Sequence, residues 1–176
     1  MVSYTPMNLP HAENLRSNRR KNHPGPFFVT KCLQPRRNLL ADATIACEIS
    51  EPLTFSVRDN RIHLAAFVIM PDHWHVLFTV HSPWTLPRLM KSVGNWVSRK
   101  TSHRLKGSDT IWQDGYYDTR VRSGKQFQYI LDYIENNPVK KGLVASRSLW
   151  NWGSANPEYK NILTRPWPWM FELDVK

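Results

Sequence analysis

Apolar and polar residues follow a pattern that predicts four strands. Residues 26–33 (Pro-Phe-Phe-Val-Thr-Lys-Cys-Leu) are β-branched and aromatic enough for a strand, and residues 118–122 are strand-like as well. Two apolar stretches, 63–70 and 75–80, are separated by Pro71-Asp72, a sequence that favours a turn. These two stretches are therefore predicted to form an antiparallel hairpin.

Two of the predicted helices have boundaries set by proline. Residues 39–56 mix helix formers with β-branched side chains, and this helix is expected to end before Pro52, because proline disfavours helical geometry at the preceding residue. A later helix begins at Ser123, a residue type that caps helix N-termini, and Pro138 is expected to stop it from going further.

The helix after the hairpin is amphipathic, with basic residues beside its apolar face. It begins at an N-cap, either Ser82 or Thr85, and runs to about His103. At about 100° per residue its apolar side chains share one arc. The neighbouring arc carries basic residues, namely Arg88, Lys91 and Arg99. Lys100 and Arg104 project onto the apolar side, so either their stems extend along the surface or the helix ends earlier.

The order of these elements is strand, helix, strand, strand, helix, strand, helix. That order suggests an α+β fold in which a ferredoxin-like antiparallel sheet packs with helices. The predicted domain spans residues 26–145. A basic N-terminal arm (1–25) precedes it, and a Trp- and Pro-rich C-terminal appendage (146–176) follows it.

Composition is typical of a globular, cytoplasmic protein. The chain has 176 residues, of which 41% are hydrophobic and 22% are charged. The longest apolar run, 64–70, is far shorter than the roughly 20 residues that a membrane-spanning helix needs, and residues 1–20 show no signal-peptide pattern. Cys32 and Cys47 have no C-x-x-C spacing, so a reducing compartment is expected.

The charge balance predicts a polyanionic partner. Lys and Arg number 24 against 14 Asp and Glu, which gives a net charge of +10. Nucleic acid is the first candidate partner and an anionic membrane surface is the second. The candidate DNA-binding residues are Arg16, Arg19, Arg20, Lys21, Arg36, Arg37, Arg88, Lys91, Arg99, Arg120 and Arg122. Trp150, Trp152 and Trp167 are candidates for base stacking, with packing into the core or tail equally open.

Two histidines open the second strand of the hairpin. Because side chains alternate along a strand, His73 and His75 point to the same side while Trp74 points to the core. Two neighbouring imidazoles are suited to holding a divalent cation. An ordinary surface or hydrogen-bonded pair is the alternative, and a metal site needs a third ligand.

The last predicted helix carries Tyr133 and Asn137 on the polar edge of its apolar face. A phenol there packs its ring and keeps its hydroxyl accessible, and a carboxamide oxygen is a suitable hard ligand for Mg²⁺ or Mn²⁺. An ordinary boundary tyrosine is the alternative. Tyr129 and the pair Tyr116-Tyr117 are rival nucleophiles on chemical grounds.

Taken together, these motifs resemble those of the REP-associated tyrosine transposases, bacterial relatives of the single-tyrosine HUH insertion-sequence transposases. The matching segments are Phe-Val-Ile-Met-Pro-Asp-His-Trp-His (67–75), Ile-Trp-Gln (111–113), Asp-Tyr-Ile (132–134) and Asn-Asn-Pro-Val-Lys-Lys-Gly-Leu-Val (136–144). The Phe-Phe-Val-Thr strand, followed by Arg36 and Arg37, also matches, so the resemblance runs from about residue 26 to residue 144.

The resemblance implies an HUH-type fold and a metal-dependent single-stranded DNA endonuclease and strand transferase. In that comparison Tyr133 is the nucleophile, His73 and His75 bind Mg²⁺ or Mn²⁺, and Asn137 is a further polar ligand. The implied substrates are palindromic REP-like hairpins, cut through a 5′-phosphotyrosine intermediate by a nucleoid-associated protein. A domesticated hairpin-binding protein without cleavage activity is the alternative function, and a relaxase or replication initiator is a third. Monomer and homodimer are both open.

Overall fold

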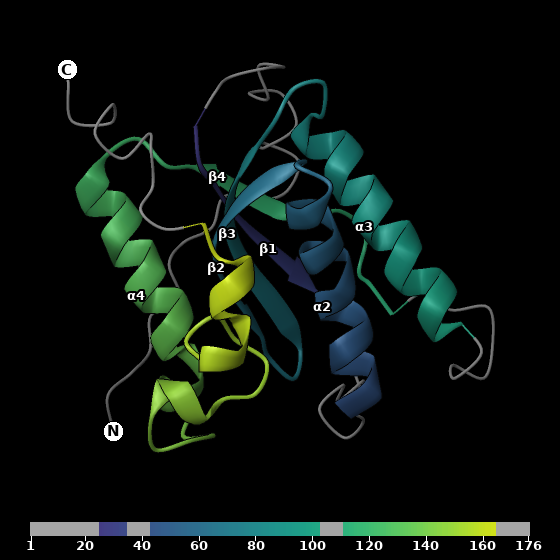
Figure 1. The fold of residues 1–176 in the computed structure, drawn as a ribbon. Coiled ribbons are helices and arrows are strands. Elements are labelled where there is room, and N and C mark those ends of the chain that lie inside the picture. Colours follow the sequence, from purple (N-terminus) through teal and green to yellow (C-terminus); the bar gives the residue numbers. More distant parts are fainter. Residues whose placement is uncertain (1–24, 35–42, 103–110, 165–176) are drawn as a thin grey trace.

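The fold is given by a computed structural model that describes residues 25–34, 43–102 and 111–164 (Figure 1). The strands described are β1 (Phe27–Cys32), β2 (Ile62–Ile69), β3 (His73–Val80) and β4 (Tyr117–Arg120). The helices described are α2 (Ala43–Arg58), α3 (Leu86–Thr101) and α4 (Gly124–Lys140), followed by the short 3-10 helices η2 (Arg147–Leu149) and η3 (Pro157–Ile162). The strands form one antiparallel sheet in the order β2-β3-β1-β4, which is the predicted ferredoxin-like arrangement.

The predicted hairpin is confirmed as β2 and β3. The Met70 amide donates to the His73 carbonyl at 2.7 Å and closes the turn that contains Pro71-Asp72. Strand β1 pairs with the other edge of β3, so that Thr30 lies opposite His75 and Cys32 lies opposite His73. The central position of β3 therefore places both histidines next to residues of β1.

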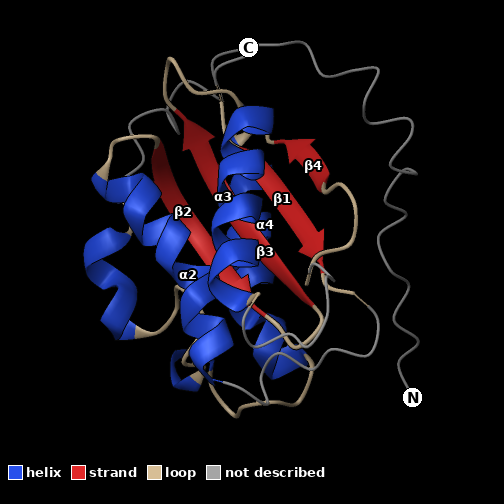
Figure 2. Ribbon diagram, turned by 90° about the vertical axis from the view of Figure 1, so that its right-hand side faces the viewer, coloured by secondary structure: helices blue, strands red, loops and turns tan. Residues whose placement is uncertain are grey.

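Helices cover both faces of the sheet. Figure 2 looks onto the layer formed by α2 and α3, with the sheet behind it and α4 on the far side. Trp74, Val76 and Phe78 are buried in the core beneath α2 and α3, as the strand alternation predicts. Leu77 and Phe28 are buried in a second core beneath α4. No helix in the described part of the chain is long and apolar enough to cross a bilayer.

Helix α2 does not end before Pro52, as the sequence predicted, but continues to Arg58. Proline lacks the N–H that would bond to the preceding turn, so the helix loses one hydrogen bond there. Ile49 and Leu53, on either side of the proline, are buried in the core with 1% and 3% of their surfaces exposed. Burial of this apolar face outweighs the lost hydrogen bond.

The N-caps of α3 and α4 follow the sequence. Thr85, rather than Ser82, caps α3, because its hydroxyl accepts from the Arg88 amide at 3.5 Å. Ser123 caps α4 in the same way, accepting from the Gln126 amide at 3.2 Å. The Lys100 ammonium lies 3.8 Å from the Glu51 carboxylate of α2, so its side chain extends across to the neighbouring helix.

Helix α4 runs two residues past Pro138, the predicted stop, to Lys140. Pro138 lies in the last turn of α4. Its missing N–H removes one hydrogen bond, and only two helical residues follow it. The Leu143 amide donates to the Pro138 carbonyl at 2.9 Å, and Gly142 adopts a φ of +69° that favours glycine and ends the helix.

Residues 146–164, which the sequence predicted as part of an extended appendage, instead pack onto the free edge of β2. The Ile69 amide donates to the Trp152 carbonyl at 2.8 Å, and the Trp150 indole donates to the Ile69 carbonyl at 3.1 Å. Gly153 forms a β-bridge with Val68, and a Cβ at Gly153 would lie 3.3 Å from the Trp150 ring and 3.4 Å from the Val68 side chain. Pairing with an exposed strand edge stabilises a segment that has no periodic pattern of its own.

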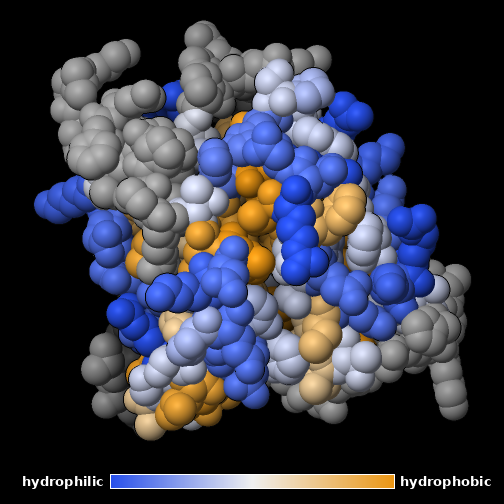
Figure 3. Space-filling model, viewed as in Figure 1, coloured by the Kyte–Doolittle hydropathy of each residue, from blue (hydrophilic) through white to orange (hydrophobic). Residues whose placement is uncertain are grey.

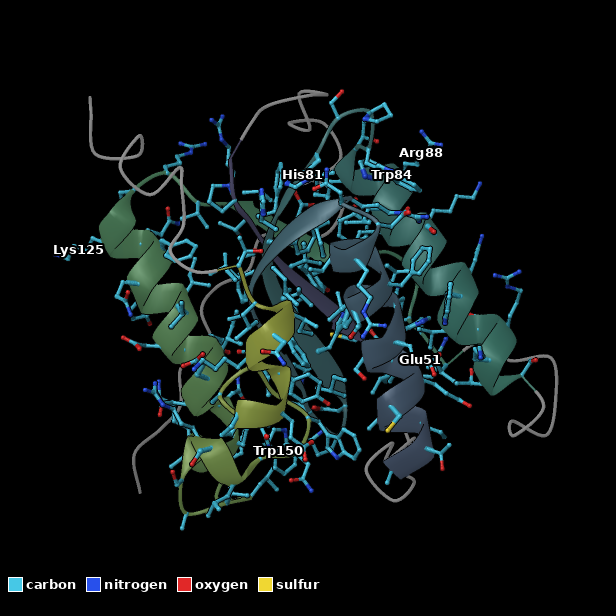
Figure 4. All side chains as sticks on the ribbon, in the orientation of Figure 1. Glu51, His81, Trp84, Arg88, Lys125 and Trp150 are labelled. Carbon is cyan, nitrogen blue, oxygen red and sulfur yellow. The ribbon has the colours of Figure 1, made fainter. Side chains whose placement is uncertain are left out.

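The same segment covers apolar surface at the edge of the sheet. Figure 4 labels Trp150 at the lower end of the view, on the segment that follows α4, and Figure 3 shows further hydrophobic side chains near the centre of the same face. Trp150 packs against the core beneath α4 and Trp152 packs against the core beneath α2 and α3. Packing, rather than base stacking, is therefore the observed environment of these two tryptophans, and Trp167 lies outside the described residues.

Candidate active site

His73 and His75 lie side by side at the start of β3, on the face of the sheet that α4 covers. Their ring centroids are 4.4 Å apart, which confirms that they point to the same side. Trp74, between them, is only 1% exposed in the opposite core. His75 is itself buried, with 5% of its surface exposed, whereas His73 is closer to solvent.

Each imidazole is held through its Nδ1 atom by a residue that the sequence analysis did not single out. Thr30 Oγ1 lies 2.8 Å from His75 Nδ1, and Asp72 Oδ1 lies 2.6 Å from His73 Nδ1. The Asp72 carboxylate accepts a hydrogen bond, so Nδ1 of His73 carries the proton. In a neutral imidazole held in this way, Nε2 carries the lone pair that a metal ligand requires. Alternation along β1 places the Thr30 side chain on the same face of the sheet as His75, and the register of β1 and β3 places it directly opposite. These two features identify Thr30 as the partner of His75.

Helix α4 brings Tyr133 to the buried histidine. The centroid of the Tyr133 ring lies 5.3 Å from that of His75 and 6.2 Å from that of Phe28, which meets it edge-on. Phe28 also lies 5.3 Å from the His75 ring, so the three rings form one cluster. The structure thus brings together two residues that are far apart in the sequence and that belong to separate predicted motifs.

Asn137 follows Tyr133 by one helical turn and is buried, with 4% of its surface exposed. Within the described residues its Oδ1 atom has no hydrogen-bond partner, and the same holds for Nε2 of His75. A buried polar atom without a partner costs about 1–3 kcal/mol. An oxygen and an imidazole nitrogen left in this state, on the same side of the sheet, fit a site for Mg²⁺ or Mn²⁺.

The candidate metal site combines two imidazoles with the carboxamide of Asn137. Among the described residues no three His, Cys, Asp or Glu side chains gather closely enough to hold a metal ion. The two histidines therefore need a ligand of another type, and the buried carboxamide of Asn137, on the helix that covers this face of the sheet, is the candidate for it. The sequence had named Asn137 from its position on the helix, and its burial is the independent structural observation.

The rival tyrosines occupy different surroundings. Tyr129 is 61% exposed on α4. Tyr116 packs against the core beneath α2 and α3, on the opposite side of the sheet from His75. Tyr117 lies opposite Thr30 in the register of β1 and β4, so by placement it is the nearest rival to Tyr133.

The predicted DNA-binding residues are spread over the molecule. Three of them, Arg88, Lys91 and Arg99, are exposed on α3, which the sheet separates from Tyr133. Figure 4 shows Arg88 beside Trp84 at this distant helix, and the guanidinium lies 4.4 Å above the indole ring. Arg120 is exposed on the edge strand β4, and Arg122 is exposed just before α4. The others, Arg16, Arg19, Arg20, Lys21, Arg36 and Arg37, lie outside the described residues.

Burial, with a smaller contribution from the neighbouring His73, lowers the pKa of His75 to about 3. His75 is therefore neutral at pH 7 and able to act as a metal ligand.

Acidification should destabilise the fold through His75. The unfolded chain protonates this residue below its ordinary pKa of about 6.5, while the folded state does not until about 3, so stability is lost as the pH falls through this window. Between pH 7 and pH 5 we expect a loss of about 2 kcal/mol from this residue. Urea unfolding in EDTA at both pH values measures it. In His75→Gln, the free energy of unfolding should fall by about 2 kcal/mol less than in the wild type between these two pH values. An equal fall in both proteins would show that His75 is not its cause.

Comparison with known proteins identifies the family. A family model described as "Transposase IS200 like" matches residues 28–137, a span that contains the histidine pair and ends at Asn137. The REP-associated tyrosine transposase of Escherichia coli (strain K12) is 30% identical over 130 residues, which cover 72% of this chain and 73% of that protein. A solved structure of a REP-associated tyrosine transposase bound to a REP hairpin aligns with a TM-score of 0.65 at 23% identity, covering 85% of this chain and 88% of that one.

The chain therefore belongs to the IS200-like transposase family. Within that family it is similar to the REP-associated tyrosine transposases, as its motifs predicted, and the aligned structure has the same fold.

Proposed function

We propose that this transposase is a metal-dependent endonuclease and strand transferase that acts on palindromic hairpins in single-stranded DNA. The observation that carries the proposal is the contact between Tyr133 and His75, next to two buried polar atoms that have no partner among the described residues. A nucleophile beside side-chain atoms that suit a divalent cation is the arrangement that phosphoryl transfer needs.

His73, His75 and Asn137 would hold Mg²⁺ or Mn²⁺. When bound, the cation supplies positive charge to a non-bridging oxygen of the scissile phosphate. Thr30 and Asp72 keep the two imidazoles oriented through Nδ1, at 2.8 Å and 2.6 Å. Trp74, anchored in the opposite core, keeps β3 from rotating, so the side on which the histidines lie does not change.

Tyr133 Oη would attack phosphorus in line with the bond to the 3′ oxygen. The Oη–P bond forms and the P–O3′ bond breaks; the phenolic proton is released and the leaving 3′ oxygen takes up a proton. The product is a 5′-phosphotyrosine with a free 3′-hydroxyl on the other fragment. Since the phosphodiester energy is kept, a 3′-hydroxyl of another strand can reverse the step and join DNA without a nucleotide cofactor.

A single strand suits this site better than a stacked duplex. Tyr133 is only partly exposed on α4, so a phosphate must leave a regular backbone to reach it. The solved relative bound to a REP hairpin supports a hairpin partner for this chain. The exposed cations Arg88, Lys91, Arg99, Arg120 and Arg122 would contact the DNA backbone at a distance from the reacting phosphate.

A doubly labelled hairpin oligonucleotide tests the proposal. Its 5′ and 3′ ends carry different dyes, its sequence is the palindrome beside the gene, and denaturing gels compare Mn²⁺ with EDTA. We expect only the 3′ dye to migrate with the protein, only with Mn²⁺, and the 5′ dye to be released on a shorter fragment. Transfer of the 5′ dye to the protein would contradict a 5′-phosphotyrosine. A tight complex with no adduct in any metal would support a hairpin-binding protein without cleavage activity instead.

A further inference from the structure

We propose that His63 and His81 form a second metal site, which takes an ion that prefers imidazole ligands, such as Zn²⁺ or Ni²⁺, while Thr79 holds a water bound to that ion. His63 lies on β2, and His81 directly follows β3. The centroids of their rings are 4.1 Å apart, slightly closer than the 4.4 Å between His73 and His75. The site is independent of the proposed cleavage chemistry.

The second histidine pair lies at the opposite end of the hairpin from the candidate active site. His73 and His75 follow the β2–β3 turn, whereas the His81 amide donates to the Arg61 carbonyl at 2.8 Å, where β2 begins. Figure 4 labels His81 at the upper end of the view and Trp150 at the lower end. The extended chain from His75 to His81 spans about 20 Å. One ion therefore cannot be shared between the two pairs.

The hydrogen bonds at Nδ1 leave Nε2 of each ring as the nitrogen that can bind an ion. The backbone oxygen and the Oδ1 atom of Asn60 lie 2.9 Å and 3.0 Å from His81 Nδ1. A carbonyl oxygen only accepts, so Nδ1 carries the proton and Nε2 of the neutral ring carries the lone pair. His63 Nδ1 lies 3.4 Å from Thr164 Oγ1. Both imidazoles are thus held on the side away from Nε2, as in other metal-binding histidines.

Two buried polar atoms at this end of the hairpin have no hydrogen-bond partner among the described residues, namely His81 Nε2 and Thr79 Oγ1. Thr79 is only 6% exposed, and it lies directly opposite His63 in the register of β2 and β3. Because side chains alternate along an extended chain, Thr79 and His81 project from the same face of the sheet. An ion on Nε2, with a water that hydrogen-bonds the Thr79 hydroxyl, would give both atoms the partners that buried polar atoms require.

The donor atoms select the kind of ion. Imidazole nitrogen suits Zn²⁺ and Ni²⁺, whereas Mg²⁺ prefers oxygen ligands. In the part of the chain that the structure describes, no third His, Cys, Asp or Glu side chain joins the pair. Water molecules would therefore complete the coordination, as they do at open zinc sites.

The nearest cationic side chain does not compete for the space between the two imidazoles. The Nε atom of Arg61 lies 2.6 Å from the Asp59 carboxylate, which offsets its charge. The guanidinium lies 4.1 Å above the Trp84 ring and 4.6 Å above the Phe55 ring, and both rings belong to the α2 and α3 side of the sheet. Arg61 is thus engaged by other partners, and little positive charge opposes a cation at the histidines.

Calorimetric titration of Zn²⁺ into the full chain tests the proposal. The starting protein is His73→Gln/His75→Gln, which lacks the candidate active-site pair. We expect it to bind one Zn²⁺ ion at the second pair, and the addition of His63→Gln or His81→Gln should weaken that binding at least about tenfold. Absence of Zn²⁺ binding to the starting protein would overturn the proposal. So would equal affinity after either addition, because the ion would then be bound elsewhere on the chain.

Thr79→Val in the same starting protein tests the role of the hydroxyl. Valine has nearly the same shape but forms no hydrogen bond, so Zn²⁺ affinity should fall about tenfold. The urea midpoint in EDTA should be equal or higher, because a buried hydroxyl without a partner is removed. The control is Thr54→Val on α2, where the hydroxyl already donates to the Ser50 carbonyl at 3.5 Å; its Zn²⁺ affinity should not change. Unchanged affinity in Thr79→Val, with a less stable fold, would overturn the assignment of Thr79.

NMR spectroscopy of the wild type locates the ion without any substitution in the measured protein. Ni²⁺ is paramagnetic and broadens the imidazole signals of its ligands, which the single variants assign. Sub-stoichiometric Ni²⁺ should broaden the signals of His63 and His81 together. If these two signals persist while those of other histidines are lost, the proposal is overturned.

Discussion

Tyr133→Phe should abolish the covalent adduct while leaving the fold and hairpin binding intact. The phenylalanine ring keeps the contacts with His75 and Phe28, so the free energy of unfolding should change by about 1 kcal/mol or less. The rate of strand cleavage should fall by about 10³-fold or more, because no other group supplies the nucleophile. Denaturing gels measure the adduct, and fluorescence anisotropy with a labelled hairpin measures binding.

The matched control is Tyr129→Phe, one helical turn earlier. This tyrosine is 61% exposed, and its substitution should leave both cleavage and binding at wild-type levels. Tyr117→Phe is the more demanding comparison, since Tyr117 lies opposite Thr30 at the edge of the same face. If either substitution removes the adduct while Tyr133→Phe retains it, the nucleophile has been assigned to the wrong residue.

Asn137→Leu should weaken metal binding without lowering the stability of the fold. Leucine has nearly the same size, and it removes a buried carboxamide oxygen that has no partner in the described part of the chain. The fold should therefore be as stable as the wild type, or more stable by about 1 kcal/mol. Mn²⁺ affinity should fall by more than the about 10–100-fold typical of a residue that only supports a metal ligand. Calorimetric Mn²⁺ titration and urea unfolding provide the two readouts.

Asn136→Leu is the neighbouring control for this substitution. Its side chain donates to the Asp132 carbonyl at 2.9 Å and is more exposed than that of Asn137, so it is not placed to hold a cation. Metal affinity and cleavage should be unchanged in this variant. Unchanged Mn²⁺ affinity in Asn137→Leu, together with a less stable fold, would show instead that Asn137 is a structural residue.

Local sequence patterns were sufficient wherever an element depends on its own residues. The β2–β3 hairpin, the alternation around Trp74 and the cap at Ser123 follow from short-range chemistry, and the cap at Thr85 is one of the two that the sequence offered. Proline was the exception. The sequence rule ends α2 before Pro52, but the helix continues to Arg58. Burial of the neighbouring apolar side chains stabilises the helix by more than the lost hydrogen bond costs.

Residues 146–164 show the same limit more clearly. Their sequence has no helical or strand period, so it predicts an appendage. What holds them is the free edge of β2, which accepts Trp152 and Gly153 through backbone contacts that no local pattern reveals. A sheet edge is a property of the assembled fold, because it depends on which strand is left without a neighbour.

The sequence by itself determined the family of this protein, its α+β order of elements and the three residues His73, His75 and Tyr133 as candidates for one chemistry. Only the tertiary structure decided that Tyr133 contacts His75, that Thr30 holds the histidine, and that His63 lies beside His81. The reason is physical. Motifs are read along the chain, whereas burial, tautomer and ring contacts depend on strand register and on how a helix packs across the sheet.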